Sequence, residues 1–268
     1  MTTSPIPPWK TAIVSAGADH IRIRGYDVTA LMQRSFGETV FLLLAGRLPT
    51  DAERRLLEAI LVGEADHGAG APSCAAARLA ASGNRQSLSA AVAAGVLTIG
   101  NEHGGAGTNC MELIAAGVAE AGRDGISIAE AADRAVARAA AAHARIPGFG
   151  HRVHTSADPR IPVLFGMARE GGVAGDGVAF VEGLEASLRA RIKPLPINID
   201  GALAAILHDM GFPAVAGQLV FVIGRVAGLA AEIAEEYARE KPMRIKIPVE
   251  YDGAPPRAID GGTRGAKE

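Results

Sequence analysis

The sequence is poor in aromatic residues and in cysteine, and both shortages restrict the folds and sites it can form. Of its 268 residues only 4% are Phe, Trp or Tyr, whereas 49% are hydrophobic, mostly in runs of Ala, Leu and Val. This composition favours close-packed helices over strands, so we predict an all-α fold. Cys74 and Cys110 are too few for a disulfide framework and lack a zinc-ligand spacing. A reducing, cytoplasmic location is expected.

The chain also lacks a strong charge of either sign and a clear membrane segment. Its formal net charge is −2, which gives no basis for wrapping nucleic acid or an anionic membrane. The N-terminus lacks the charged and then apolar pattern of a signal peptide. The apolar stretch 214–231 contains Arg225 and leads into several glutamates. We therefore predict a buried core helix there and no membrane span.

Capping signals locate two helices. Thr50 and Glu53 form a capping box ahead of a one-sided apolar face, and Ser127 and Glu130 form a second one. The alanine-rich helix that follows Ser127 has to end near residue 145, before Pro147. Short alternating segments at 11–14 and 21–24 predict a small N-terminal hairpin, and the glycines and prolines from residue 253 onward predict a mobile tail.

Three segments place a titratable side chain beside glycine or proline: residues 101–105, 147–152 and 198–201. They contain His103, His151 and Asp200, which together could move protons on and off carbon and oxygen near neutral pH. Taken singly, each has an ordinary alternative. The glycines after His103 suit either helix packing or a ligand, and an aspartate at a helix start is as readily an N-cap.

The segment around His151 suits either a plain helix-to-helix loop, with an Asp-Pro turn and a solvated arginine, or an anion site. Its loop amides, together with a guanidinium at Arg160 that could grip a carboxylate with two parallel hydrogen bonds, suit an anionic ligand and an adenine. Dinucleotide binding is disfavoured, because the third glycine and the preceding strand are missing. A metal site at His151 and His154 is a weak alternative, because no third ligand is obvious nearby.

Taken in order, several segments resemble the citrate synthase superfamily over nearly the whole chain: residues 24–28, 38–50, 65–68, 103–105, 148–153, 158–160, 198–201 and 224–228. The His67-Gly68 pair, residues 95–100, Gly201 and the shortness of the chain are most similar to the short citryl-CoA lyases and to the C-terminal module of ATP-citrate lyase. That module does not keep a histidine at the position of His103. The resemblance therefore favours a free-standing lyase or a small synthase.

The resemblance implies an architecture and an assembly. A large helical domain would comprise residues 1–103 and 199–268, and a small helical domain residues 104–198. Closure of the two domains would assemble the site and exclude water. A homodimer is expected.

The resemblance also implies roles for the three titratable residues in interconverting citryl-CoA with acetyl-CoA and oxaloacetate. In cleavage, His151 would accept the hydroxyl proton, His103 would hold the enolate oxygen and Asp200 would protonate the enolate carbon. In synthesis the same groups would act in reverse.

Binding residues follow from the same resemblance. His67, Arg160 and Arg225 would surround the four-carbon dicarboxylate, and a further cation from the partner subunit has two candidates here, Arg244 and Lys246. Coenzyme A would pack its adenine against Pro147, Gly148, Phe149 and Gly150, with Arg152 near its phosphates. We expect no permanently bound cofactor and no metal, because the coenzyme A thioester enters as a substrate.

Alternatives remain open at this point. The chain could be a citrate synthase or a 2-methylcitrate synthase, or a non-catalytic subunit of a larger citrate-activating assembly. The physiological direction and the preferred acyl group are not specified by the sequence.

Overall fold

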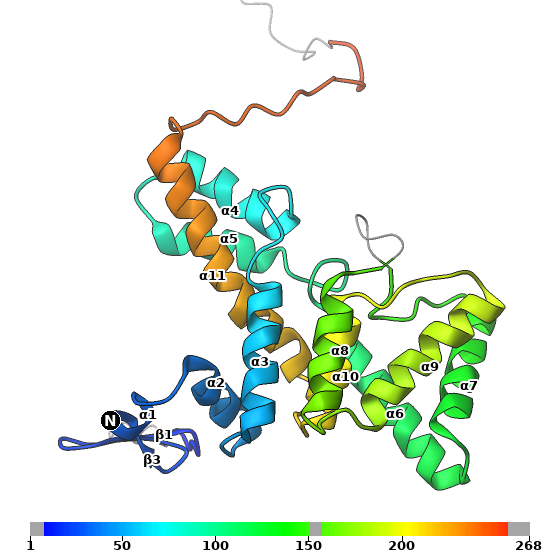
Figure 1. Ribbon diagram of the computed structural model, residues 1–268. Coiled ribbons are helices and arrows are strands. Elements are labelled where there is room, and N and C mark those ends of the chain that lie inside the picture. The colour runs from blue at the N-terminus through cyan, green and yellow to red at the C-terminus, as the bar shows by residue number, and fades with distance from the viewer. Residues whose placement is uncertain (1–7, 151–156, 257–268) are drawn as a thin grey trace, which may run out of the picture.

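The computed structural model describes residues 8–150 and 157–256, and these are predominantly helical (Figure 1). This confirms the predicted all-α fold. The helices within the described residues are α1 (Val28–Leu31), α2 (Phe36–Ala45), α3 (Asp51–Glu64), α4 (Pro72–Gly83), α5 (Leu88–Leu97), α6 (Ala106–Asp124), α7 (Ile128–Ala141), α8 (Arg160–Glu170), α9 (Asp176–Arg191), α10 (Ile199–Asp209) and α11 (Ala216–Arg239).

A small antiparallel sheet precedes the helices, with strands in the order β1 (Val14–Ala16), β2 (Ile21–Ile23) and β3 (Tyr26–Asp27). Val14 pairs with Ile23 across the hairpin, so the predicted hairpin is confirmed. The third strand was not predicted, because two residues are too few to show an alternating pattern. In Figure 1 the sheet lies beside α1 and α2, at the edge of the molecule.

The capping signals place the helix starts correctly. At α3 the Thr50 side chain accepts the Glu53 amide while the Glu53 carboxylate accepts the Thr50 amide, which is a complete capping box. At α7 the Ser127 hydroxyl accepts the Glu130 amide. This helix ends at Ala141, well before Pro147.

Helix α11 is the long apolar helix predicted for residues 214–231. It is the one helix among the described residues that is long and apolar enough to cross a membrane, yet 56% of its apolar window is buried in the fold. It packs against α3, α4, α5 and α6, as a core helix does. A Cβ added to Gly107 of α6 would lie only 2.7 Å from the carbonyl oxygen of Gly217, so α6 and α11 approach backbone to backbone.

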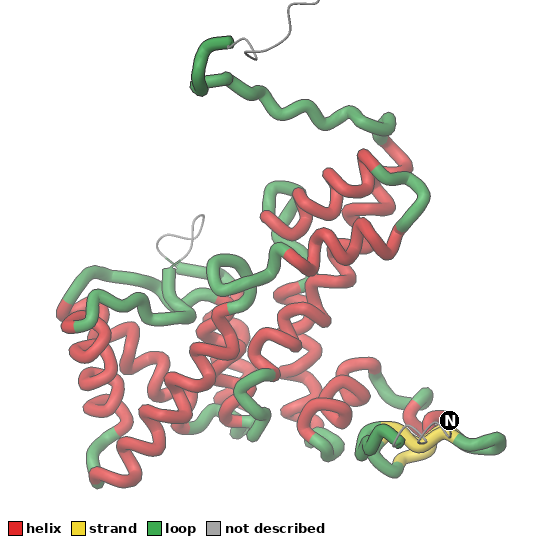
Figure 2. Tube along the Cα trace, turned by 180° about the vertical axis from the view of Figure 1, so that it is seen from behind, coloured by secondary structure: helices red, strands yellow, loops and turns green. Residues whose placement is uncertain are grey.

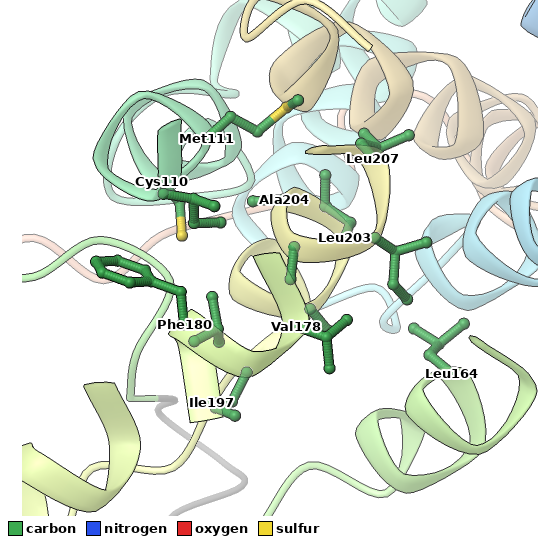
Figure 3. Packing of buried hydrophobic residues seen from close by; sticks show 14 of the residues in the cluster. Cys110, Met111, Leu164, Val178, Phe180, Ile197, Leu203, Ala204 and Leu207 are labelled. Atoms are coloured by element: carbon green, nitrogen blue, oxygen red, sulfur yellow. The ribbon is translucent and has the colours of Figure 1, made fainter. Parts of the chain in front are cut away.

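The main core surrounds α10, which is buried at every residue from Ile199 to Leu207. Figure 3 shows Leu203, Ala204 and Leu207 of this helix among side chains of α6, α8 and α9. A second apolar cluster, which includes Cys74 and Leu229, joins α4, α5 and α11. Beyond α11 the chain runs away from the body as an extended segment (Figure 2). The division into domains at residues 103 and 199 stays a prediction.

Candidate active site

Two of the segments singled out in the sequence form one structural unit. The Asn198 amide donates to the Gly148 carbonyl at 3.0 Å, and the Asn198 side chain donates to the Gly150 carbonyl at 2.9 Å. Gly148 has a φ of 87°, and a Cβ there would lie 2.7 Å from the Gly201 Cα. The glycines therefore allow the loop before residue 151 to dock directly on the start of α10.

Asn198, and not Asp200, caps helix α10. The Asn198 side chain accepts the Gly201 amide at 3.1 Å, so the N-cap alternative for Asp200 is wrong. Asp200 lies in the first turn, is 9% exposed, and its Oδ1 has no hydrogen-bond partner among the described residues. Burial raises the pKa of Asp200 to about 6, against the opposing fields of Arg160 and Arg225. This carboxyl can gain or lose a proton near neutral pH.

His103 is held by Ser73, a residue that the sequence did not single out. The Ser73 amide donates to Nε2 of His103 at 3.2 Å, and the Ser73 Oγ lies 2.9 Å from the same nitrogen. An amide can only donate, so Nε2 is the acceptor and the ring proton lies on Nδ1. The glycines after His103 serve packing: a Cβ on Gly104 would lie 2.1 Å from the Phe221 ring.

Arg225 is buried at 2% exposure and fixed on several sides. Its Nε donates to the Glu64 carbonyl at 2.9 Å, and its Nη1 donates to the Ser73 hydroxyl at 2.9 Å. The guanidinium carbon lies 4.9 Å from the centre of the Phe221 ring. Hydrogen bonds therefore run from Arg225 through Ser73 to His103, which links the predicted substrate cation to the predicted enolate-binding histidine.

Arg160 is paired differently from the expectation. Its Nε and Nη2 donate to the Asp158 carboxylate at 2.9 and 2.6 Å, and its Nη1 donates to the Gly63 carbonyl at 2.8 Å. In this structure Asp158 occupies the guanidinium edge that we expected to grip the substrate. Arg160 can still offer its remaining terminal N–H groups to an anion.

These residues meet around a cavity of about 530 Å³, here called the histidine cavity. It brings together five residues that the sequence predicted for the site. They are His67, His103, Arg160, Asp200 and Arg225.

A second cavity of about 840 Å³, here called the loop cavity, contains all four described residues predicted to contact coenzyme A. These are Pro147, Gly148, Phe149 and Gly150. The two cavities share Glu102, Gly150, Asn198 and Asp200 in their linings. Asp200 therefore lies where they meet.

Two arginines line the loop cavity and were not predicted as site residues. Arg138 forms a two-pronged pair with Glu120 at 3.0 and 2.7 Å, and Arg145 pairs with Glu102 at 3.0 Å. In the sequence Arg138 is only one residue of a polar helix face. The approach of α7 to the 147–150 loop, which brings Arg138 to the cavity, depends on the fold and does not show in the sequence.

His151 and Arg152 lie outside the described residues, so their predicted roles stay predictions. Of the two candidates for the partner-subunit cation, Arg244 pairs with Glu236 of its own chain at 2.9 and 2.5 Å. Lys246 is exposed. The choice between them stays open.

One group of side chains in the described part of the chain offers ligand atoms within 4.8 Å of one another, namely Asp66, Cys74 and Glu232. Glu232 is already paired with Arg78, and Asp66 accepts the Gly68 amide. These carboxylates are therefore engaged in holding the structure.

Comparison with known proteins shows the family of the chain. The sequence model described as citrate synthase, C-terminal domain, matches residues 49–246. The chain belongs to the citrate synthase family. This confirms the resemblance predicted from the ordered motifs. The solved structure of citryl-CoA lyase from Hydrogenobacter thermophilus is 39% identical in sequence, with a TM-score of 0.84, and the match covers 94% of this chain and 97% of that one.

Two further matches have a lower sequence identity than that lyase. A citrate synthase from Haloferax volcanii is 28% identical over 207 residues, covering 75% of this chain and 52% of the relative. The chain thus spans about half the length of that curated relative. An ATP citrate lyase from Methanosaeta concilii, solved in complex with (3S)-citryl-CoA, has a TM-score of 0.73 at 18% identity, over 93% of this chain and 43% of that one. At that identity the match shows the shared fold alone.

Proposed function

We propose that the protein is a citryl-CoA lyase, which cleaves citryl-CoA to acetyl-CoA and oxaloacetate by acid/base catalysis. The observation that carries the proposal is the position of Asp200, a buried carboxyl between a cavity lined by cations and a cavity lined by the 147–150 loop. A substrate that is a dicarboxylate at one end and a thioester at the other would place its central bond near this carboxyl.

The histidine cavity suits the oxaloacetate half. Arg160 and Arg225 supply guanidinium groups, which match the planar geometry of carboxylates, and His67 lies in the same lining. Both guanidiniums are held by carbonyls at the C-terminal end of α3. Preorganised cations of this kind bind an anion with little rearrangement.

The loop cavity suits coenzyme A. Its lining of loop backbone and the Phe149 ring offers a surface for a flat base. Arg138 and Arg145 add positive charge for phosphates, beside the predicted contribution of Arg152. The larger volume of this cavity, about 840 Å³, agrees with the bulkier half of the substrate.

Cleavage then follows from the roles predicted for three side chains. His151 accepts the hydroxyl proton as the carbon–carbon bond breaks, and the bonding electron pair becomes the enolate of acetyl-CoA. The Nδ1–H of His103, whose tautomer is fixed by Ser73, donates to the enolate oxygen. Asp200 in its acid form protonates the enolate carbon. Exchange with solvent returns the proton from His151 and restores that of Asp200.

The 39% identity and the TM-score of 0.84 with the Hydrogenobacter citryl-CoA lyase support the lyase over a synthase. Citrate synthases and 2-methylcitrate synthases among the curated relatives support the alternative, a citrate or 2-methylcitrate synthase. We also propose a cytoplasmic homodimer in which the two domains close over the substrate.

Product analysis tests the proposal. Purified protein is mixed with citryl-CoA, without ATP or metal, and the products are identified by mass spectrometry, with Asp200→Asn protein as the control. Acetyl-CoA and oxaloacetate support the lyase. Citrate and free coenzyme A as the main products would leave the synthase alternative. No turnover in either direction would favour a non-catalytic subunit.

A further inference from the structure

A buried carboxyl lies beneath the histidine cavity and has no role in the mechanism above. Glu64, the last residue of α3, is 0% exposed. Neither of its carboxyl oxygens has a hydrogen-bond partner among the described residues. A polar group buried in this way costs folding free energy, so its presence requires an explanation.

The structure surrounds Glu64 with the charged groups of the site. Asp200 on α10, Arg160 on α8 and Arg225 on α11 all act on its carboxyl electrostatically. These three helices pack against α3. The contact is close, because a Cβ added to Gly224 of α11 would lie 3.3 Å from the Glu64 Cβ.

The backbone at the end of α3 is part of the same arrangement. The Gly63 carbonyl accepts from Arg160, and the Glu64 carbonyl accepts from Arg225. Glu64 thus stands on the turn that holds both guanidiniums. Because it is fully buried, substrate cannot touch it, and any effect on substrate passes through these arginines and Asp200.

The charge state of Glu64 follows from its surroundings. Burial raises the pKa of Glu64 well above its ordinary value, the Asp200 charge raises it further, and Arg160 and Arg225 oppose both effects. The carboxyl is therefore neutral over a wider pH range than an exposed glutamate. It becomes an anion only when the pH rises far enough.

We propose that Glu64 is a positioning residue that sets how strongly Arg160 and Arg225 bind the substrate dicarboxylate. Neutral Glu64 leaves to the substrate the positive field of Arg225 and the part of the Arg160 field that the paired Asp158 carboxylate does not offset, whereas ionised Glu64 attracts both guanidiniums and repels the substrate anion. The inference rests on the proposed function, because it takes oxaloacetate as the ligand.

The direction of the pH effect follows by linkage. A bound dianion disfavours a second anion nearby, so oxaloacetate raises the pKa of Glu64 further and its binding is coupled to proton uptake at alkaline pH. Affinity falls as the pH rises through the range in which Glu64 ionises. One unit charge within the field of the buried Arg225 and the half-buried Arg160 predicts a fall of about tenfold.

Calorimetric titration with oxaloacetate, from about pH 5.5 to about pH 9, tests this coupling over the range in which buried carboxyls titrate. Each titration is repeated in two buffers of different ionisation enthalpy, which gives the number of protons taken up on binding. The proteins compared are the wild type, Glu64→Gln, and Glu64→Met as a second neutral replacement of similar length. Asp200→Asn removes the other buried carboxyl and serves as the matched control.

We expect wild-type affinity to fall at alkaline pH with proton uptake, and both neutral Glu64 variants to lose this fall and this uptake. Asp200→Asn should keep the alkaline fall and the proton uptake but shift both to lower pH, because it removes the charge that raises the pKa of Glu64, and it should abolish the behaviour near pH 6, where Asp200 titrates. If the Glu64 variants bind with the wild-type pH dependence, the role of Glu64 is refuted while the proposed function stands. A wild type that binds no oxaloacetate at any pH overturns the proposed function, and this inference with it.

Discussion

The two cavities that meet at Asp200 hold their cations in opposite ways. In the histidine cavity Arg225 is 2% exposed and is fixed by a carbonyl, a hydroxyl and an aromatic ring. In the loop cavity the side chains of Arg138 and Arg145 are 57% and 88% exposed and form surface ion pairs. Buried pairs are costly to break, whereas surface pairs contribute little. The histidine cavity is thus built for one small anion, and the loop cavity can admit a large, flexible one.

The largest effect is expected at the junction. Asp200→Asn should lower turnover by about 10²–10⁴-fold, because a positioned proton transfer is lost. Folding should survive, since Oδ1 has no partner among the described residues. Burial raises the Asp200 pKa from 3.8 to about 6, so ionisation destabilises the native state increasingly as the pH rises between these two values and fully above 6, and the neutral amide removes this cost. Turnover and thermal unfolding are measured together. Near wild-type turnover in folded protein would contradict the mechanism.

The next effect tests the histidine cavity. Arg225→Lys should weaken oxaloacetate binding by about 10–150-fold, because each lost charge-assisted hydrogen bond is worth roughly 1.5–3 kcal/mol. It should also lower turnover, since Ser73 and His103 lose their support. Arg160→Lys should act mainly on binding. Calorimetry and steady-state kinetics separate the two, and unchanged affinity in both variants would remove these arginines from the site.

Much of this arrangement was predictable because its residues lie in short contiguous motifs. His67, His103, Asp200 and Arg225 each come from a short segment that is weak evidence by itself, and the order of these segments along the chain carries the resemblance that assigned them. All four line one cavity. The capping boxes and the apolar runs likewise predicted where the helices begin. These features are local in sequence, so reading the chain was enough.

Other features depend on contacts between distant segments. Ser73 belongs to the site because it lies where α4 contacts both His103 and Arg225. No residue next to Ser73 in the sequence indicates these contacts. In the sequence Glu64 is an ordinary polar residue near the end of a helix. Only the fold shows that α8, α10 and α11 pack around it. Asn198 and Asp200 are both good N-caps, and only the hydrogen bond to Gly201 decides between them.

The pH dependence of turnover tests the role of the Asp200 carboxyl, which both cavities share. With the pKa of Asp200 at about 6, its acid form is depleted above that pH and its base form below it. Citryl-CoA cleavage should therefore fall as the pH rises through 6, and the synthetic direction should rise, by up to about tenfold per pH unit. Turnover numbers at saturating substrate in both directions, in one buffer series, provide the measurement, because cleavage takes up no net proton and kcat/KM therefore has the same pH dependence in both directions. The same pH dependence of the turnover number in both directions would show that Asp200 does not exchange the proton.

A smaller effect is expected from Ser73, which links His103 to Arg225 in the histidine cavity. Ser73→Ala keeps the amide that fixes the His103 tautomer but removes the hydroxyl between His103 and Arg225. Of the two hydrogen bonds that the hydroxyl makes, the neutral one to His103 acts on turnover, and its loss predicts a drop of about fivefold. The loss of the acceptor for Arg225 should appear mainly in oxaloacetate binding. Ser82→Ala, at a buried hydroxyl without a partner in the described chain, is the matched control and should leave turnover unchanged. A drop as large as that of Asp200→Asn would mean that Ser73 does more than position the ring.

The smallest effect is expected in the loop cavity. It tests whether the two cavities differ in how firmly they hold their arginines. The Arg145 and Glu102 side chains are 88% and 80% exposed, so Arg145→Ala should raise the KM for citryl-CoA by about fivefold at most and leave kcat unchanged. Because salt screens exposed charges, the effect should shrink at high ionic strength. Arg123→Ala, at an arginine 69% exposed and paired with its neighbour Asp124, controls for the loss of a surface charge. A hundredfold rise in KM, or a fall in kcat, would show that the loop cavity is as tightly organised as the histidine cavity. The contrast between a fixed and an adaptable half of the site would then be wrong.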